Sequence, residues 1–209
     1  MSSSRKRWVL WGAGLLVAAS LLAYYFIFRV PSPEEVAKDA IAAIEAGDGR
    51  RLLRLISEEE VAGLGLTEES LSCLLRTLFS QYARAELRDG EVALEPKPDM
   101  GVVFVRQPYR LPDGREWSIE ADVTTGSGRP KIENALRVLI YGRIWLEFDR
   151  LREEERADKR QALARLFEEL APELQKCGLM GMPTLDELRF VYSVEPWEQY
   201  ISRLRGNGR

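Results

Sequence analysis

The chain of 209 residues contains no histidine and only two cysteines. Without histidine, Ser-His-Asp and Cys-His nucleophile systems, zinc sites with imidazole ligands and acid–base catalysis by imidazole are excluded. Two cysteines alone are too few for a structural zinc site. We therefore expect no bound metal, and the commonest hydrolase chemistries are ruled out.

Glycine-rich loops that cradle phosphate are also missing. Gly63-Leu64-Gly65 and Gly126-Ser127-Gly128 lack the strand–turn–helix context that such loops need, and Gly12-Ala13-Gly14 lies inside an apolar run. Two acidic runs, Glu58-Glu59-Glu60 and Glu153-Glu154-Glu155, resemble metal-binding clusters only in composition. Consecutive carboxylates on a helix point in different directions, so we interpret both runs as solvated surface. No cofactor is expected.

The charge balance weighs against nucleic acid as a partner. All 33 acidic residues lie beyond the apolar run at the N-terminus, whereas three of the 30 basic residues precede it. The remainder of the chain therefore carries about −6, which repels phosphate backbones and anionic membrane surfaces.

One long apolar run is present, the 21 residues from Trp8 to Phe28, none of them charged. As a helix it would span about 31 Å, enough for the ~30 Å hydrocarbon core of a bilayer. A cleaved signal peptide is the alternative, because Val17-Ala18-Ala19 has the small side chains of a cleavage site. Apolar residues continue well past this triplet, so we predict an uncleaved transmembrane signal-anchor over residues 8–28.

The flanks of this run set its predicted orientation. Basic residues are concentrated before it, and only one comes closely after it; they are Arg5, Lys6, Arg7 and Arg29. The positive-inside bias predicts a cytoplasmic tail over residues 1–7 and, from residue 29 onward, an extracytoplasmic domain at the cell membrane. Amphipathic rings stand at both ends of the run, where they suit the lipid headgroups: Trp8, Trp11, Tyr24 and Tyr25.

Two sequence features bear on partners and on covalent structure. Gly14 and Ala18 form a small-xxx-small pair that lets two membrane helices approach closely, so a homodimer is an expected partner besides the bilayer. In an extracytoplasmic domain, Cys73 and Cys177 could form a disulfide that contributes about 3–5 kcal/mol by loop closure. Two independent buried thiols are the alternative, and the sequence leaves both open.

The first part of the domain has helical periodicity. Ser32-Pro33-Glu34-Glu35 has the pattern of a capping box, which predicts a helix from there to Gly47. Asp48 is the predicted cap of a second, short helix. A third helix is expected to begin near Thr67, where leucines recur at helical spacing.

Strand patterns come next along the chain. Arg88-Asp89-Gly90 is a hairpin-turn signal between two short apolar segments, 85–87 and 91–94. Further strands are expected at 102–105 and 116–123, and the total is about four antiparallel strands.

The last third, residues 126–209, is expected to be a mainly helical extension of the same domain. Residues 131–148 fit a helix or a strand, and we favour a helix because the apolar pattern continues into a clearly helical stretch. Pro172 should end or kink the helix of that stretch. Thr184-Leu185-Asp186-Glu187 has a capping-box pattern that predicts another short helix, and a final one is expected over 196–204.

This order of elements has a family resemblance. A helix, the segment EAGDGRRLLRLIS (Glu45 to Ser57), another helix and then a meander of strands resemble the nuclear-transport-factor-like superfamily, over about residues 32–125. The resemblance implies a cystatin-like α+β cone, in which helices pack on a curved antiparallel sheet over residues 29–125. Some members are bacterial domains held on N-terminal membrane anchors.

The same resemblance implies a pocket between sheet and helices, where some enzymes of the superfamily place an acidic residue and a tyrosine. The side chains that could supply such a pair are Glu120, Asp122, Tyr82 and Tyr109. Alternation argues against this pair, because Glu120 and Asp122 lie opposite the apolar face of Trp117, Ile119 and Ala121 and hence outside.

Three functions remain from the sequence. The first is a non-catalytic binding or interaction module, tethered to the membrane and facing an unidentified protein or small ligand. The second is a bitopic scaffold subunit of an envelope assembly. The third is a small-ligand enzyme that uses the carboxylate and tyrosine pocket.

Overall fold

The computed structural model describes residues 29–79, 86–87, 92–110, 114, 116–125, 128–186, 189 and 191–206. The predicted anchor over 8–28 lies outside these residues, as do Arg5, Lys6, Arg7, Trp8, Trp11, Tyr24 and Tyr25. Within the described ranges, no helix is long and apolar enough to cross a membrane. Contacts divide the chain into residues 1–31 and 32–209, and the second unit contains the helices and strands of the described fold.

Helices open this unit: α2 (Pro33–Ala46), α3 (Gly49–Leu53), α4 (Glu58–Leu64) and α5 (Glu68–Phe79). The predicted capping box is confirmed, because the Ser32 hydroxyl accepts from the Glu35 amide while the Glu35 side chain accepts from the Ser32 amide. Gly47 ends α2 with φ of 63°, a left-handed conformation that glycine adopts without strain. Asp48 caps α3 as expected, whereas α4 was not predicted.

The described part of the chain forms an antiparallel sheet of five strands in four rows. Its strands are β1 (Glu86–Leu87), β2 (Ala93–Lys97), β3 (Val102–Arg110), β4 (Glu116–Thr124) and β5 (Ile132–Glu133). β1 and β2 both pair with β3, one after the other along the same edge. The predicted hairpin between segments 85–87 and 91–94 is therefore wrong, and its turn at 88–90 lies outside the described residues. The tight connection instead joins β2 to β3 through a 3-10 turn, η1 (Pro98–Met100).

Alternation along β3 and β4 divides the sheet into two faces. Val105, Tyr109, Ile119 and Val123 are buried, and α2 packs against these two strands. Intervening residues such as Arg106 are exposed or half-buried. The apolar face predicted from residues 116–123 is therefore confirmed.

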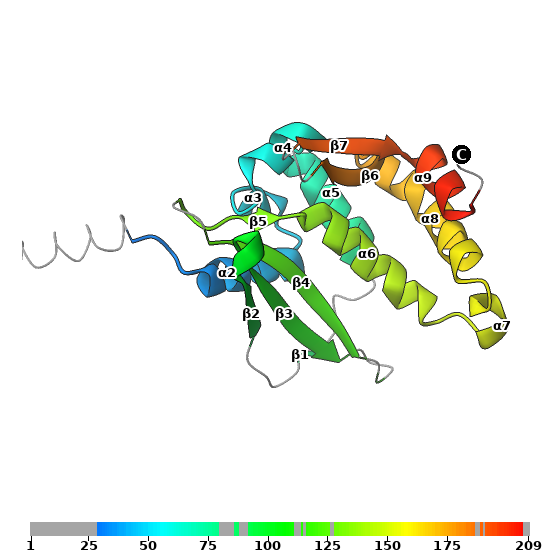
Figure 1. Ribbon diagram of the computed structural model, residues 1–209, viewed down its shortest axis with the longest axis horizontal. Coiled ribbons are helices and arrows are strands. Elements are labelled where there is room, and N and C mark those ends of the chain that lie inside the picture. The colour runs from blue at the N-terminus through cyan, green and yellow to red at the C-terminus, as the bar shows by residue number, and fades with distance from the viewer. Residues whose placement is uncertain are drawn as a thin grey trace, which may run out of the picture. The chain divides into compact units, whose positions relative to one another are not determined.

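The remaining elements are α6 (Ala135–Phe148), α7 (Glu153–Arg156), α8 (Lys159–Lys176), β6 (Gly181–Asp186), β7 (Val191–Pro196) and α9 (Trp197–Leu204). In Figure 1, α6 runs beside β4, and α8 lies on the other side of α6 with α9 packed against it. Residues 131–148 are mostly helical, as favoured. α8 continues through Pro172 to Lys176, so the helix does not end at the proline.

The expected helix at Thr184 is wrong, because residues 181–186 form a hairpin with β7. Gly181 permits this pairing. A Cβ there would lie 2.0 Å from the Glu195 carbonyl oxygen, so the close pairing of the two strands requires a glycine. The C-terminal third is thus helical with a two-stranded sheet inserted before α9.

The two cysteines are joined in a disulfide, with their Cα atoms 5.4 Å apart across 104 residues of sequence. Cys73 lies on α5, and Cys177 caps the end of α8. The bond therefore links α5, one of the N-terminal helices, to the end of α8 in the C-terminal part of the unit.

Candidate functional site

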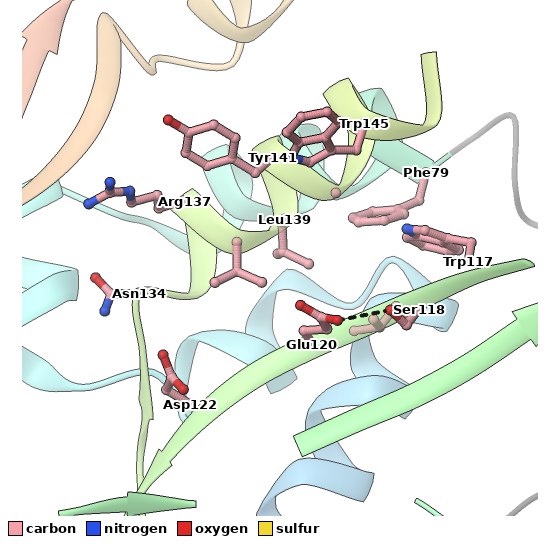
Figure 2. Close-up of a pocket in the computed structure, with 13 residues that line it drawn as sticks. Phe79, Trp117, Ser118, Glu120, Asp122, Asn134, Arg137, Leu139, Tyr141 and Trp145 are labelled. Atoms are coloured by element: carbon pink, nitrogen blue, oxygen red, sulfur yellow. Dashed lines mark hydrogen bonds between the residues drawn. The ribbon is translucent and has the colours of Figure 1, made fainter. Parts of the chain in front are cut away.

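A cleft of about 510 Å³ lies between β4 and α6. Its walls come from three elements: Phe79 on α5; Trp117, Ser118, Ile119, Glu120 and Asp122 on β4; and Asn134, Arg137, Val138, Leu139, Tyr141, Gly142 and Trp145 on or beside α6. Figure 2 shows the carboxylates of β4 facing α6 across this space. A volume of this size suits a small organic ligand.

The cleft exists because β4 is only partly paired on this edge. β4 pairs with β3 along its whole length, but with β5 only at Asp122 and Val123. The Thr124 amide donates to the Lys131 carbonyl on the β5 side. Because outward-facing peptide groups alternate along a strand, the N–H and C=O groups of Ser118 and Glu120 face the cleft.

The chain turns from β5 into α6 at Asn134. This residue has φ of 56°, the one non-glycine among the described residues with a positive φ. Left-handed backbone is tolerated by asparagine better than by most residues. The turn sends α6 back along β4 and so makes the second wall of the cleft.

One end of the cleft is aromatic. The rings of Phe79 and Trp117 have their centroids 5.5 Å apart, and the Tyr109 ring lies 5.4 Å from that of Trp117. Gly142 on α6 faces this wall: a Cβ there would lie 3.6 Å from the Trp117 Nε1. Since glycine has no side chain, α6 approaches Trp117 closely here, and the indole Nε1 is buried.

The floor of the cleft carries two carboxylates. Glu120 is bound by the Arg106 Nε at 3.0 Å and accepts from the Ser118 hydroxyl at 3.1 Å. The half-buried Asp122 makes no side-chain hydrogen bond or ion pair to any other residue that the structure describes. Burial raises the pKa of the Asp122 carboxyl, with Lys97 opposing the rise and Glu120 adding to it.

One basic residue, Arg137, is among the described residues that line the cleft, and it forms no ion pair with either carboxylate there. Its guanidinium lies 5.8 Å from the centre of the Tyr141 ring, at the other side of the cleft from Glu120 in Figure 2. The side of the cleft formed by β4 is therefore acidic.

A buried glutamate holds the beginning of α6. Glu60, on α4, is 0% exposed, and its carboxylate accepts from the amides of Ala135 and Leu136 at 3.1 Å each. Burial raises its pKa to about 7, although these two amides pull the value down. The interpretation of residues 58–60 as solvated surface is thus wrong for Glu60, which caps a helix 75 residues further along the chain.

Polar contacts around Glu60 connect α6 to the C-terminal hairpin. The Tyr192 hydroxyl on β7 donates to the Glu133 carboxylate and accepts from the Asn134 amide. The Ser57 hydroxyl also donates to Glu133, at 3.0 Å. This network fixes the end of the cleft at which α6 begins.

The structure brings together only part of the predicted acid–tyrosine set. The expectation that Glu120 and Asp122 lie outside is wrong, because both line the cleft. Tyr109 lies on the opposite face of the sheet, where its hydroxyl donates to Glu45 at 2.8 Å. Tyr82 lies outside the described residues. Among the residues that the structure describes, no group of three His, Cys, Asp or Glu could hold a metal ion.

Comparisons with protein-family models, with curated proteins and with solved structures found no match for this chain.

Proposed function

We propose that this protein is a membrane-anchored, extracytoplasmic module that binds a small ligand in the β4–α6 cleft without transforming it. The cleft carries this proposal. It combines an aromatic end, an acidic floor and outward peptide groups of β4, the mixture of apolar wall and few polar groups that is typical of ligand sites.

Two independent features support the proposed location. The apolar run of residues 8–28 comes after three basic residues, which favours a cytoplasmic N-terminus. The Cys73–Cys177 disulfide supports an oxidising compartment, because such bonds persist there and are rare in the cytosol. Both favour the extracytoplasmic side of the membrane for residues 32–209.

Binding is favoured over catalysis by the separation of the polar groups. An acid–base pair must lie within hydrogen-bond reach of one reacting group. Tyr109 and the two carboxylates of β4 are on opposite faces of the sheet, and Glu120 is engaged by Arg106. A carboxylate in a half-buried cleft is suited to holding and orienting a ligand.

Gly142 allows a direct test, because it lines the aromatic end of the cleft and has no side chain. We expect Gly142→Phe to occupy the space and to abolish ligand-induced stabilisation. Gly142→Ala is the matched control: its Cβ meets only ordinary van der Waals contact, so the cleft stays open. The alanine should also stabilise the helix by about 1 kcal/mol.

The measurement is the Tm of the full chain in lipid nanodiscs with a panel of small cationic, anionic and neutral metabolites. A compound present at about 100 times its Kd stabilises by about 2.7 kcal/mol, which for a unit of this size raises Tm by roughly 5 °C or more. Val138→Phe, on the same wall, serves if the Gly142→Phe chain fails to fold. Equal shifts in the wild type and in a filled-cleft variant that folds would contradict the proposal, as would a panel without any shift.

A further inference from the structure

We propose that the ligand of the β4–α6 cleft is an organic cation, an amine that carries an aromatic or aliphatic body. This inference rests on the proposed function, because it names the ligand class of that same cleft. Three features of the cleft carry it: the acidic floor, the aromatic end and the acceptors on the edge of β4.

The acidic floor has an unused carboxylate. Glu120 has Arg106 as a partner, whereas the Asp122 side chain has no ion pair or hydrogen bond within the described residues. A half-buried carboxylate without a direct hydrogen bond or ion pair is costly, and a bound cation reduces that cost. Lys97, the basic group that opposes the rise in the pKa of Asp122, is instead placed over the Phe104 ring, 4.4 Å from its centre.

The edge of β4 adds acceptors of a suitable kind. An ammonium group has three N–H donors and no acceptor. One can go to the Asp122 carboxylate and another to the outward carbonyl oxygen of Glu120, because no strand pairs with this part of β4 in the described structure. The third can go to water. The N–H groups of the same edge could serve an anionic ligand, so it is the two carboxylates of the floor that favour a cation over an anion.

The aromatic end suits the far part of a long molecule of this kind, because Trp117 is five residues from Asp122, about 16 Å along an extended strand. Trp117 and Phe79 give an apolar wall, and aromatic faces also attract cations. Cations already lie on other rings at the rim: Lys159 over Trp145 at 4.7 Å and Arg137 over Tyr141 at 5.8 Å. The rings around the cleft therefore accept cationic groups as well as apolar ones.

A divalent metal ion fits these donors less well. Ca²⁺ takes six to eight oxygen ligands, and Mg²⁺ demands a regular octahedron. The two carboxylates on this floor are few for either ion, and one of them is bound to Arg106. The donor set and the apolar wall together favour an amine.

Three probes of nearly equal shape isolate the charge: 2-phenylethylamine, 2-phenylethanol and phenylacetate. Each is titrated into the full chain in nanodiscs of zwitterionic lipid by calorimetry, and empty nanodiscs correct for partitioning into the bilayer. We expect the amine to bind at least tenfold more tightly than the alcohol, and the carboxylate to bind most weakly.

The matched variants are Asp122→Asn in the cleft and Asp99→Asn at the exposed turn before β3. Asp122→Asn should weaken amine binding about tenfold and leave alcohol binding within twofold, while Asp99→Asn should change neither. Unfolding curves of both variants check that the fold is retained.

The outcomes separate this inference from the proposed function. The inference of a cationic ligand is overturned if the amine does not bind or if phenylacetate binds more tightly than the amine. It is also overturned if Asp122→Asn leaves amine binding unchanged. In those cases the proposed function still stands if another compound of the metabolite panel binds in a manner sensitive to Gly142→Phe. If every compound that binds does so equally well to the wild type and to the Gly142→Phe variant, both the cation inference and the proposed function are overturned.

Discussion

Glu60 is a carboxylate inside the core that must lose its solvation whenever it ionises. Its pKa in the folded state is about 7, raised from 4.5 mainly by burial. The folded protein therefore holds this proton more tightly than the unfolded chain does. Protonation of Glu60 therefore stabilises the folded state. This contribution is fully present below about pH 4.5 and is lost as the pH rises through 7.

We expect the free energy of unfolding to show this loss, on the order of 3 kcal/mol between pH 4.5 and 8, from Glu60 alone. Glu60→Gln removes the titrating group and one of the two acceptors for the amides of Ala135 and Leu136. The variant should therefore be most destabilised at pH 5 and least at pH 8. Urea unfolding of the full chain across this range, for both proteins, measures the difference; parallel pH profiles would contradict the assignment.

For single residues, the sequence predicts hydrogen-bond partners that are close in the chain and misses those that are far apart in it. Ser57 followed by Glu60 has the S-x-x-E spacing of a helix start, so α4 was within reach of the sequence. The carboxylate instead caps α6, and no local pattern indicates a contact across 75 residues. Alternation correctly placed Glu120 and Asp122 on the face of the sheet opposite the buried one. It contains no information about α6, which lies beside β4 and forms the other wall of the cleft.

At the scale of elements, the helices with clear caps were predictable and the short strands were not. Ser32, Gly47 and Asp48 determine helix ends by local hydrogen bonds and backbone preference, which a sequence displays directly. The capping-box pattern at Thr184 failed because a strand pairing, permitted by Gly181, competes with it. Pairing of β1 and β2 with β3 likewise depends on tertiary context. The resemblance to the nuclear-transport-factor-like superfamily stays a prediction.

The disulfide joins two elements, α5 and the end of α8, that are far apart in the sequence. Closing a loop of 104 residues in the unfolded chain removes much of its entropy. We expect Cys73→Ser with Cys177→Ser to lower the free energy of unfolding by about 3–5 kcal/mol. Urea unfolding of the oxidised wild type, the reduced wild type and the double variant measures this.

The reduced wild type is the internal control for the serine substitutions. It should unfold near the double variant, and far below the oxidised protein. Two results together would show that the disulfide is not formed. The unfolding curve would be unchanged by the reductant, and two free thiols would be titrated in the unfolded chain before reduction.

On the scale of the whole molecule, the predicted anchor and the disulfide make one joint prediction about topology. The basic flank of the apolar run favours a cytoplasmic position for residues 1–7, and the disulfide independently favours an oxidising environment for residues 73 and 177. A cytosolic domain would lose the bond and with it part of its stability. Location and stability are therefore expected to be coupled in this chain.

Single cysteines in a Cys73→Ser, Cys177→Ser background test that topology with a maleimide that does not cross membranes. Ser3→Cys reports on the tail, and Gly128→Cys reports on an exposed turn of the domain. In bacterial spheroplasts we expect Gly128→Cys to be labelled at once and Ser3→Cys only after lysis, since three basic residues favour a tail held inside. An intact mass that includes residues 1–28 distinguishes an anchor from a removed signal peptide. Labelling of Gly128→Cys only after lysis would place the domain in the cytoplasm, where the disulfide would not persist and the proposed extracytoplasmic role would fail.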